Sequence, residues 1–357
     1  MNQQPRILEI GNYPPPRCGW SVRTEFLVQH LRRAGVECQV LNIGPSRRER
    51  RPECVDVQSG SDYLRKLVRF AVRRYRFHVH ANGDSPKGFV LIAVAYGVGL
   101  ASGLRPVLTF HAGISQRFFP RKSLPWRIFF RLFFGLPSRV ICNSDAVRRA
   151  ITAYGISEAK VHAIPAFTTR YVEDLDTEEP LPTSISSFLA RHSPVLACYA
   201  YFRPEFELDS LLRAVAAARR DYDDLGLVLI GHLQGHEPVA ALARELGIAN
   251  RVHFAGDLPH GQFLATMREV DLCIRTHTRD GVSSSVLEAL ALGTPVLACR
   301  NESRPAGVVT YDGSSLEDLT EKLLACLSSL SDLKVNTAQP PPGEDTLDAE
   351  MRVLVGA

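Results

Sequence analysis

Two carboxylates lie eight positions apart in the segment TRDGVSSSVLEALALGTPVLA, residues 278–298. Asp280 is expected at the exit of a strand, and Glu288 about one turn inside a helix that stops at Gly293. Three serines that can cap this helix stand between them: Ser283, Ser284 and Ser285. The N–H groups and the positive dipole end of a helix start bind phosphate. The pattern predicts a phosphate site with Glu288 on a ribose diol and Asp280 on a sugar hydroxyl; the alternative is a capped helix with one solvated glutamate.

A histidine at the end of another strand is the second candidate. His111 directly follows VLTF, residues 107–110, and functional side chains collect at the carboxyl ends of parallel strands. His78 and His80 alternate along an earlier strand, but no carboxylate is clustered with them in the sequence, so we expect no metal and no cofactor. Two acidic pairs are expected to be solvated: Asp174 with Asp176, and Asp221 with Asp223.

Apolar strand patterns alternate with helical patterns along the chain, which predicts βαβ units, parallel sheets and an α/β fold. The strands expected in the first half are 6–10, 37–43, 76–81, 106–110, 139–143 and 160–164. Those expected in the second half are 194–201, 226–231, 251–256, 271–275 and 295–299. We expect a first domain over 1–171, an acidic linker over 172–193, a nucleotide-binding domain over 194–335, and a segment over 336–357 whose helix packs back on the first domain.

The segment 278–298 resembles the Glu, seven residues, Glu motif of retaining family 4 glycosyltransferases of the GT-B class, with ALALGTPVLA matching the run that follows it. Further segments resemble the family in order and spacing: GNYPPPRCGW with the helix after it, LTFHAG, RVICNSDAVRRAITAYGISEAKVHAIPAF, and LVLIGHLQGHEPVAALARELGIANRVHFAGDLPHGQFLATMREVDLCIRTHTRDG. The resemblance covers most of the chain. It implies two Rossmann-like doubly wound domains that face an interdomain cleft.

By this resemblance, a glycosyl unit passes from a nucleotide-sugar to an acceptor with retention at the anomeric carbon. We expect a UDP-sugar first of all as the donor and a glycan or lipid-linked glycan as the acceptor, in cell-surface polysaccharide synthesis. Glu288 would bind the donor ribose, and Asp280 and His111 the donor sugar. Gly281 and the amides from Ser283 to Val286 would hold the diphosphate, which they would stabilise as it departs. Gly19 would let the first-domain loop approach the donor closely.

The chain departs from the family pattern after the first strand of the second domain. Family members usually carry an Arg and a Lys there, and Tyr201 and Phe206 take those places here. Arg203 lies between them, and Arg275 and Arg279 could reach the diphosphate from the motif loop. Each is a candidate to replace a missing charge, although a surface role for Arg203 is an equal alternative. Trp20 follows Gly19 where a second glycine is usual, so it either narrows a pocket or fills the core.

The two halves of the chain differ in charge. Residues 1–170 hold 27 lysines and arginines against 10 acids, whereas residues 171–357 hold 15 against 28. The basic half contains the aromatic stretch QRFFPRKSLPWRIFFRLFFGLPSR, 116–139, which predicts either an amphipathic helix on an anionic membrane surface or a packed helix with arginines at its rim. We expect a cytoplasmic protein, peripheral on the inner face of the membrane. Nucleic acid is not an expected partner, because no reader motif is present.

Other classes are excluded or held as alternatives. The eight cysteines show no CxxC pair, which argues against a disulfide framework or a zinc site. The N-terminal residues lack the pattern of a signal peptide, which argues against secretion by this route. The apolar run 88–104 is expected to be a buried helix rather than a membrane span. GNYPPPRCGW is not GxGxxG, which argues against an NAD-dependent oxidoreductase. A nucleotide-sugar epimerase on the same fold and a catalytically silent scaffold stay open.

Overall fold

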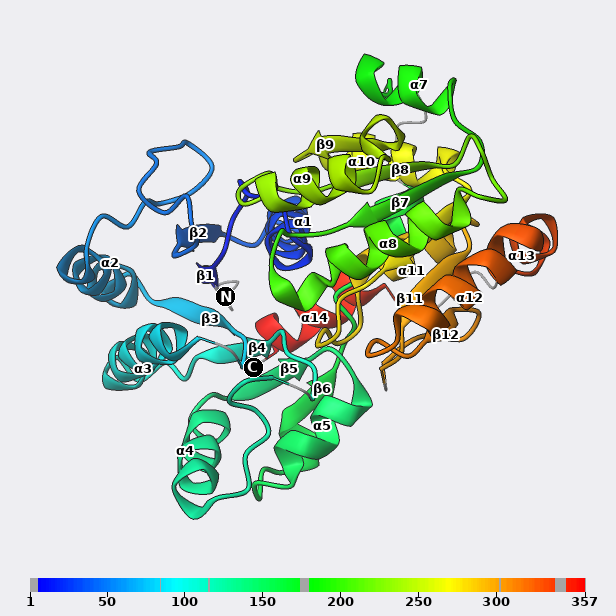
Figure 1. Ribbon diagram of the computed structural model, residues 1–357. Coiled ribbons are helices and arrows are strands. Elements are labelled where there is room, and N and C mark those ends of the chain that lie inside the picture. Colours follow the sequence, from blue (N-terminus) through cyan, green and yellow to red (C-terminus); the bar gives the residue numbers. More distant parts are fainter. Residues whose placement is uncertain are drawn as a thin grey trace. The chain divides into compact units, whose positions relative to one another are not determined.

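The computed structural model describes residues 6–83, 85–114, 116–173, 180–301, 303–337 and 345–356. The chain forms two compact units, which Figure 1 colours from blue to red along the sequence. Unit 1 contains residues 1–168 and 344–357, and unit 2 contains residues 169–343. Asp174 and Asp176 lie outside the described residues.

Unit 1 is built on a parallel six-stranded sheet in the order β2-β1-β3-β4-β5-β6. Its strands are β1 (Arg6–Gly11), β2 (Cys38–Asn42), β3 (Tyr75–Ala81), β4 (Val107–Phe110), β5 (Arg139–Cys142) and β6 (Val161–Ala163). All six strands expected for this half are present. Its helices are α1 (Gly19–Arg33), α2 (Gly60–Val72), α3 (Pro86–Ala101), α4 (Leu124–Gly135), α5 (Asp145–Thr152), the 3₁₀ turn η1 (Glu158–Lys160) and α14 (Thr346–Val355).

Helices cover both faces of this sheet, because side chains alternate along each strand. On one face, Leu8, Phe77 and Leu108 pack with residues of α2, α3, α4 and α5. On the other face, Ile7 and Val107 pack with residues of α1 and of the C-terminal helix α14. The last helix of the chain therefore belongs to the core of unit 1.

Unit 2 is built on a second parallel sheet, in the order β12-β11-β10-β7-β8-β9. Its strands are β7 (Val195–Tyr199), β8 (Gly226–Ile230), β9 (Val252–Gly256), β10 (Leu272–Arg275), β11 (Val296–Cys299) and β12 (Val309–Tyr311). Its helices are α6 (Arg170–Glu173), α7 (Thr183–Leu189), η2 (Pro204–Phe206), α8 (Leu208–Ala218), α9 (Glu237–Glu245), η3 (Ala249–Arg251), α10 (His260–Glu269), α11 (Ser284–Ala291), α12 (Leu316–Ser328) and α13 (Leu330–Asn336). Residues of α8, α9 and α12 pack on one face, and residues of α7, α10 and α11 on the other.

Two features of unit 2 differ from the sequence expectation. The short strand β12 was not expected, because its three residues stand in the segment 303–315, whose glycines, serines and proline are typical of a loop. Part of the predicted linker 172–193 is the helix α7, whose Ile185 and Phe188 are buried in unit 2. Residues 183–189 are thus part of the domain core rather than a connection.

The apolar run 88–104 contributes most of α3, which buries Ile92 and Tyr96 against the sheet of unit 1. Among the described residues, no helix is long and apolar enough to cross a membrane.

Candidate active site

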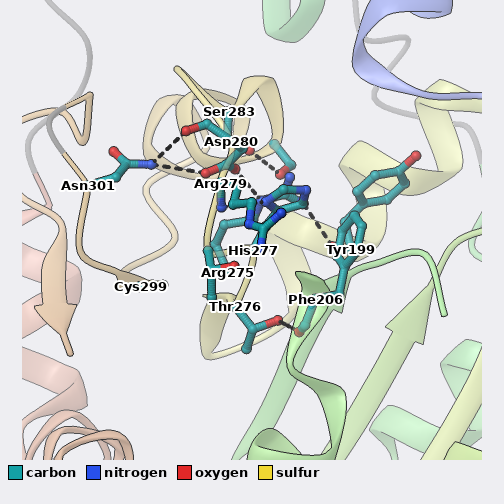
Figure 2. Close-up of polar contacts among 12 residues, drawn as sticks. Tyr199, Phe206, Arg275, Thr276, His277, Arg279, Asp280, Ser283, Cys299 and Asn301 are labelled. Carbon is teal, nitrogen blue, oxygen red and sulfur yellow. Dashed lines mark hydrogen bonds and ion pairs between the residues drawn. The ribbon is translucent and has the colours of Figure 1, made fainter. Parts of the chain in front are cut away.

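Asp280 lies in a cluster of polar side chains beyond the carboxyl ends of β10 and β11 (Figure 2). Arg275 Nε and a terminal nitrogen of Arg304 each lie 2.8 Å from a carboxylate oxygen of Asp280. Asn301 donates its side-chain N–H to Asp280 Oδ1 at 3.0 Å. The Asp280 side chain is 12% exposed, and those of Arg275 and Arg304 are 9% and 4% exposed. Two buried cations thus hold one carboxylate.

The charges of this cluster fix its ionisation. Burial alone would raise the pKa of Asp280, but Arg275 and Arg304 outweigh it and hold this pKa below its usual range. Burial favours neutral Arg275, yet the Asp280 carboxylate raises its pKa. The neighbouring His277 has its pKa lowered to about 4, by burial first and then by Arg275. At neutral pH the cluster therefore holds an ionised carboxylate, two guanidinium groups and a neutral imidazole.

Arg275 also contacts two residues outside the motif, Tyr199 at the end of β7 and Phe206 in η2. It donates an N–H to the Tyr199 carbonyl at 3.0 Å, and its guanidinium lies 5.3 Å from the centre of the Phe206 ring. Phe206, which takes the place of a family cation, thus supports a different cation. Arg203 is exposed and lies over Tyr201 at 5.3 Å.

The serines do not cap the helix in the way the sequence predicted. Ser283 occupies the N-cap position of α11, but its side chain makes no capping hydrogen bond. Its hydroxyl instead lies 3.0 Å from the Ser285 hydroxyl, and both residues are buried. The Val286 N–H, expected at the diphosphate, donates to the Ser283 carbonyl at 3.2 Å. Ser284 begins the helix and is half-buried, as is Gly281 before it.

Glu288 is buried in α11, so the alternative of a solvated glutamate is wrong. His260, the first residue of α10, approaches its Oε1 with Nε2 at 2.9 Å. The ring of Tyr171 packs edge-on against the His260 ring, with centroids 5.4 Å apart. One imidazole therefore orients the carboxylate that the motif places a turn inside the helix.

His111 lies at the end of β4 in unit 1, as expected. Its ring is held by contacts with His80 and Trp20. His111 Nε2 lies 2.8 Å from His80 Nδ1, and His80 Nε2 lies 2.8 Å from Glu9 Oε2. Trp20 is half-buried and stacks on the His111 ring with centroids 4.9 Å apart. Gly19 begins α1 and is exposed.

A carboxylate does lie beside His78 and His80, contrary to the expectation from the sequence. Glu9, on the neighbouring strand β1, lies directly opposite His78 in the sheet register. Glu9, His78 and His80 form the one group among the described residues whose ligand atoms are close enough to surround a metal ion. The ring nitrogens lie 2.7 and 2.8 Å from the same Glu9 oxygen, which are hydrogen-bond distances.

Four residues that shape these sites were not found from the sequence: Glu9, His260, Asn301 and Arg304. The first of them interrupts the apolar run RILEI, and a charged residue inside a buried strand is a signal that points to a paired or functional group. Three other residues considered from the sequence are exposed at the surface: Arg279, Asp221 and Asp223. For the two aspartates this agrees with the expectation that they are solvated.

Two family models match the chain, one on each half. The model "Glycosyltransferase Family 4" matches residues 19–168, and "Glycosyl transferases group 1" matches residues 185–316. A relative is the GDP-mannose-dependent alpha-(1-6)-phosphatidylinositol monomannoside mannosyltransferase of Mycolicibacterium smegmatis, 28% identical over 48% of this chain and 48% of the relative. Another is the D-inositol 3-phosphate glycosyltransferase of Nocardia farcinica, 29% identical over 45% of this chain and 37% of the relative. The chain spans about half the length of the curated relatives it matches.

Solved structures share the fold at low identity. HepE of Anabaena, in complex with UDP-glucose, superposes with a TM-score of 0.68 at 18% identity, covering 97% of both chains. A putative UDP-N-acetylglucosamine 2-epimerase from Listeria monocytogenes superposes with a TM-score of 0.70 at 16% identity, covering 99% of this chain and 96% of the other. Matching models on both halves, two Rossmann-like units and the acidic pair at 280 and 288 lead to one conclusion: the chain belongs to the family 4 glycosyltransferases of the GT-B class.

Proposed function

We propose that this protein is a retaining glycosyltransferase that moves a hexosyl unit from a nucleotide-sugar to a glycan or lipid-linked glycan acceptor in cell-surface polysaccharide synthesis. The observation that carries the proposal is a pair of oriented carboxylates around the start of α11, the buried Glu288 and Asp280, whose side chain is 12% exposed. Each is held by its own positively charged or polar partners, as preorganised binding groups require.

Unit 2 supplies the groups that a nucleotide diphosphate needs. The Glu288 carboxylate, oriented by His260, accepts hydrogen bonds from the ribose diol. Arg275 and Arg304 offer two guanidinium groups to the diphosphate and make up for the missing family cations. Asp280 pairs with both arginines, so the donor diphosphate would compete with this carboxylate for the two cations. UDP-sugars are the first expected donors; the names of the relatives make GDP-mannose the second.

The chemistry needs no covalent enzyme intermediate. The bond from the anomeric carbon to the diphosphate oxygen breaks, and the acceptor hydroxyl oxygen forms the new bond on the same face. The hydroxyl proton leaves with the departing diphosphate. Preorganised cations at the site of developing negative charge lower the barrier to this step. Neither a metal nor a cofactor is part of the proposal.

The acceptor proposal depends on the surface of α4. Its aromatic residues Phe130, Phe133 and Phe134 are buried, whereas Leu124, Ile128 and Leu132 are 54–69% exposed at a spacing of four. Residues 86–144 contain eight lysines and arginines and no acid. Each basic residue near anionic headgroups contributes about 1 kcal/mol to binding. This surface suits a peripheral position on the inner face of the membrane, beside a lipid-linked acceptor.

A panel of UDP-glucose, UDP-N-acetylglucosamine, dTDP-glucose and GDP-mannose tests the donor by thermal shift. At least one should raise the melting temperature, and Glu288→Gln should abolish the shift, because the amide replaces one acceptor oxygen with a donor. Glu269→Gln, the same change on the exposed end of α10, is the matched control. If no donor binds, the scaffold alternative replaces the proposal.

Product analysis tests the reaction. Slow hydrolysis of the bound donor, stimulated by a membrane extract, is expected, and NMR of the product should show the anomeric configuration of the donor sugar. An inverted product would contradict retention. Conversion of the donor into its epimer would favour the epimerase alternative instead, which the fold likeness to a putative 2-epimerase makes worth measuring.

A further inference from the structure

The chain of contacts that ends at His111 begins at a buried carboxylate. Glu9 and His78 are fully buried and His80 is 2% exposed, all within the sheet of unit 1. Glu9 Oε2 lies 2.8 Å from His80 Nε2, and His80 Nδ1 lies 2.8 Å from His111 Nε2. The three groups come from three adjacent strands, β1, β3 and the end of β4, so the sheet itself sets their spacing.

Charge counting decides which groups are ionised. His78 Nδ1 lies 2.7 Å from Glu9 Oε2, and His78 Nε2 lies 2.7 Å from the Thr109 hydroxyl. Burial favours a neutral His78 ring, but the Glu9 carboxylate outweighs it and raises this pKa. Burial alone would raise the pKa of Glu9, yet His78 and His80 hold it at about 2. Glu9 is therefore ionised and pairs with the ring of His78.

A second buried pair closes the network from the helices that cover this face. Arg23 of α1 donates to Glu350 of α14 at 2.9 Å, and the Thr109 hydroxyl lies 3.4 Å from the other Glu350 oxygen. With Arg23 balancing Glu350 and His78 balancing Glu9, the described residues of this network leave no uncompensated negative charge that would hold a second proton on His80 or His111. Burial first, and then the charge of His78, lowers the pKa of His80, and burial with His80 lowers that of His111.

Proton positions follow along the chain of contacts. An ionised carboxylate only accepts hydrogen bonds, so the His80 nitrogen that faces Glu9, Nε2, carries the hydrogen. A neutral imidazole carries one N–H, which makes His80 Nδ1 an acceptor. The His111 nitrogen that faces it, Nε2, is then the donor. His111 Nδ1 is left without a proton.

The rings are also fixed sterically. The His111 backbone N–H donates to the Ala81 carbonyl at 2.7 Å, and Trp20 stacks on the ring at an interplanar angle of 27°. His80 lies parallel to His111, with an interplanar angle of 9°. A Cβ atom at Gly11 would lie only 3.0 Å from the His80 ring, so the glycine at the end of β1 leaves the space that this ring occupies.

We propose that Glu9 and His80 are positioning residues that present His111 as a neutral ring whose Nδ1 accepts a hydrogen bond from a hydroxyl of the bound sugar. The role of the sugar rests on the proposed function; the tautomer of His111 does not. The proposal also gives His78 a task, because its ring is the counter-ion that keeps Glu9 ionised. Thr109 holds this ring through its other nitrogen, at 2.7 Å.

Ring-nitrogen NMR of the full chain, labelled with ¹⁵N-histidine, tests the proposal without an activity assay. Signals of His111 are assigned from their loss in His111→Gln. Between pH 6 and 8 the wild-type ring should show a protonated Nε2 and a bare Nδ1, without titrating. A protonated Nδ1 would overturn the proposal. One tightly bound metal ion per chain, found by elemental analysis and lost in Glu9→Gln, would also overturn it, because the ring nitrogens would then be ligands.

Kinetics with the best donor from the panel provide the second arm. His80→Phe keeps an aromatic ring in the space but removes both nitrogens. It should lower kcat about tenfold to a hundredfold, by analogy with the loss of a partner that orients a metal-bound histidine. The nucleotide-induced thermal shift, which depends on unit 2, should stay unchanged. His162→Phe on β6, whose buried Nε2 has no hydrogen-bond partner among the described residues, is the matched control. A kcat of His80→Phe within twofold of the control would contradict the positioning role, whereas absence of any donor binding would count against the proposed function alone.

Discussion

Replacing Asp280 by asparagine isolates the carboxylate that two buried arginines share. Asp280→Asn keeps the size of the side chain and an oxygen that can accept from Asn301. It removes the negative charge that faces Arg275 and Arg304, each within 2.8 Å. The two guanidinium groups would then repel each other in a site where water has little access.

The expected magnitude follows from burial. Removing one partner of a buried ion pair costs about 3–5 kcal/mol, because the remaining charge is left without compensation. The retained hydrogen bond to Asn301 and the stacking of Arg275 on Phe206 place the loss near 3 kcal/mol. For a unit of this size, each kcal/mol lowers the melting temperature by about 2–4 °C. We therefore expect a decrease of roughly 6–12 °C.

Inorganic pyrophosphate gives the second half of the assay. If the arginines bind the donor diphosphate, pyrophosphate should bind Asp280→Asn more tightly than the wild type, where the carboxylate competes for the same cations. At a hundred times its dissociation constant, a ligand adds about 2.7 kcal/mol, which would restore most of the loss. Transfer activity should still fall, because the asparagine cannot accept from the sugar hydroxyl with two oxygens.

Asp223→Asn makes the same chemical change at an exposed position of unit 2 and should lower the melting temperature by at most about 4 °C, since surface charges contribute about 0–1 kcal/mol. A melting temperature of Asp280→Asn equal to that of this control would refute the buried-pair reasoning. Equal pyrophosphate shifts in the variant and the wild type would refute the assignment of the arginines to the diphosphate.

Three further outcomes are expected. Ile128→Glu combined with Leu132→Glu should reduce flotation of the protein with phosphatidylglycerol vesicles at least tenfold, whereas Val72→Glu, at another exposed apolar position, should not. If the wild type bound neutral phosphatidylcholine vesicles as strongly as phosphatidylglycerol vesicles, charge would have no role. Burial and then Arg275 lower the pKa of His277 from 6.5 to about 4, so on acidification the unfolded chain takes up the proton before the folded chain does. The stability that this neutral ring contributes is therefore complete above pH 6.5 and is lost as the pH falls toward 4. The loss amounts to at most about 3 kcal/mol. In His277→Asn, the free energy of unfolding measured with urea should depend less on pH between 6.5 and 4. An unchanged pH dependence would contradict the lowered pKa. Glu350→Gln should lower the free energy of unfolding of unit 1 by about 3–5 kcal/mol, because it leaves the buried arginine of α1 without its carboxylate; a change under 1 kcal/mol would show that the pair is dispensable.

Local sequence patterns were sufficient to locate the strands, the motif and the family. Eleven predicted strands are present, because each is an apolar run bounded by turn residues and needs no distant information. Asp280 and Glu288 were placed correctly at the exit of a strand and inside the following helix. The strand β12 and the helix α7 were missed, because β12 stands in a segment rich in glycine, serine and proline, and the serine-rich surface of α7 resembles a linker.

Only the tertiary structure decided which partners these residues meet. Arg304 and His260 reach the two carboxylates from other elements, 24 and 28 positions away in the sequence. Glu9 meets His80 across 71 positions, and Glu350 meets Arg23 across 327. The physical reason is that helix and strand periodicity reports which side of an element is buried, whereas pairing of buried charges depends on strand order and on helices that return from far along the chain. The sequence thus identified the candidate site residues, and the fold decided which partners hold and orient them.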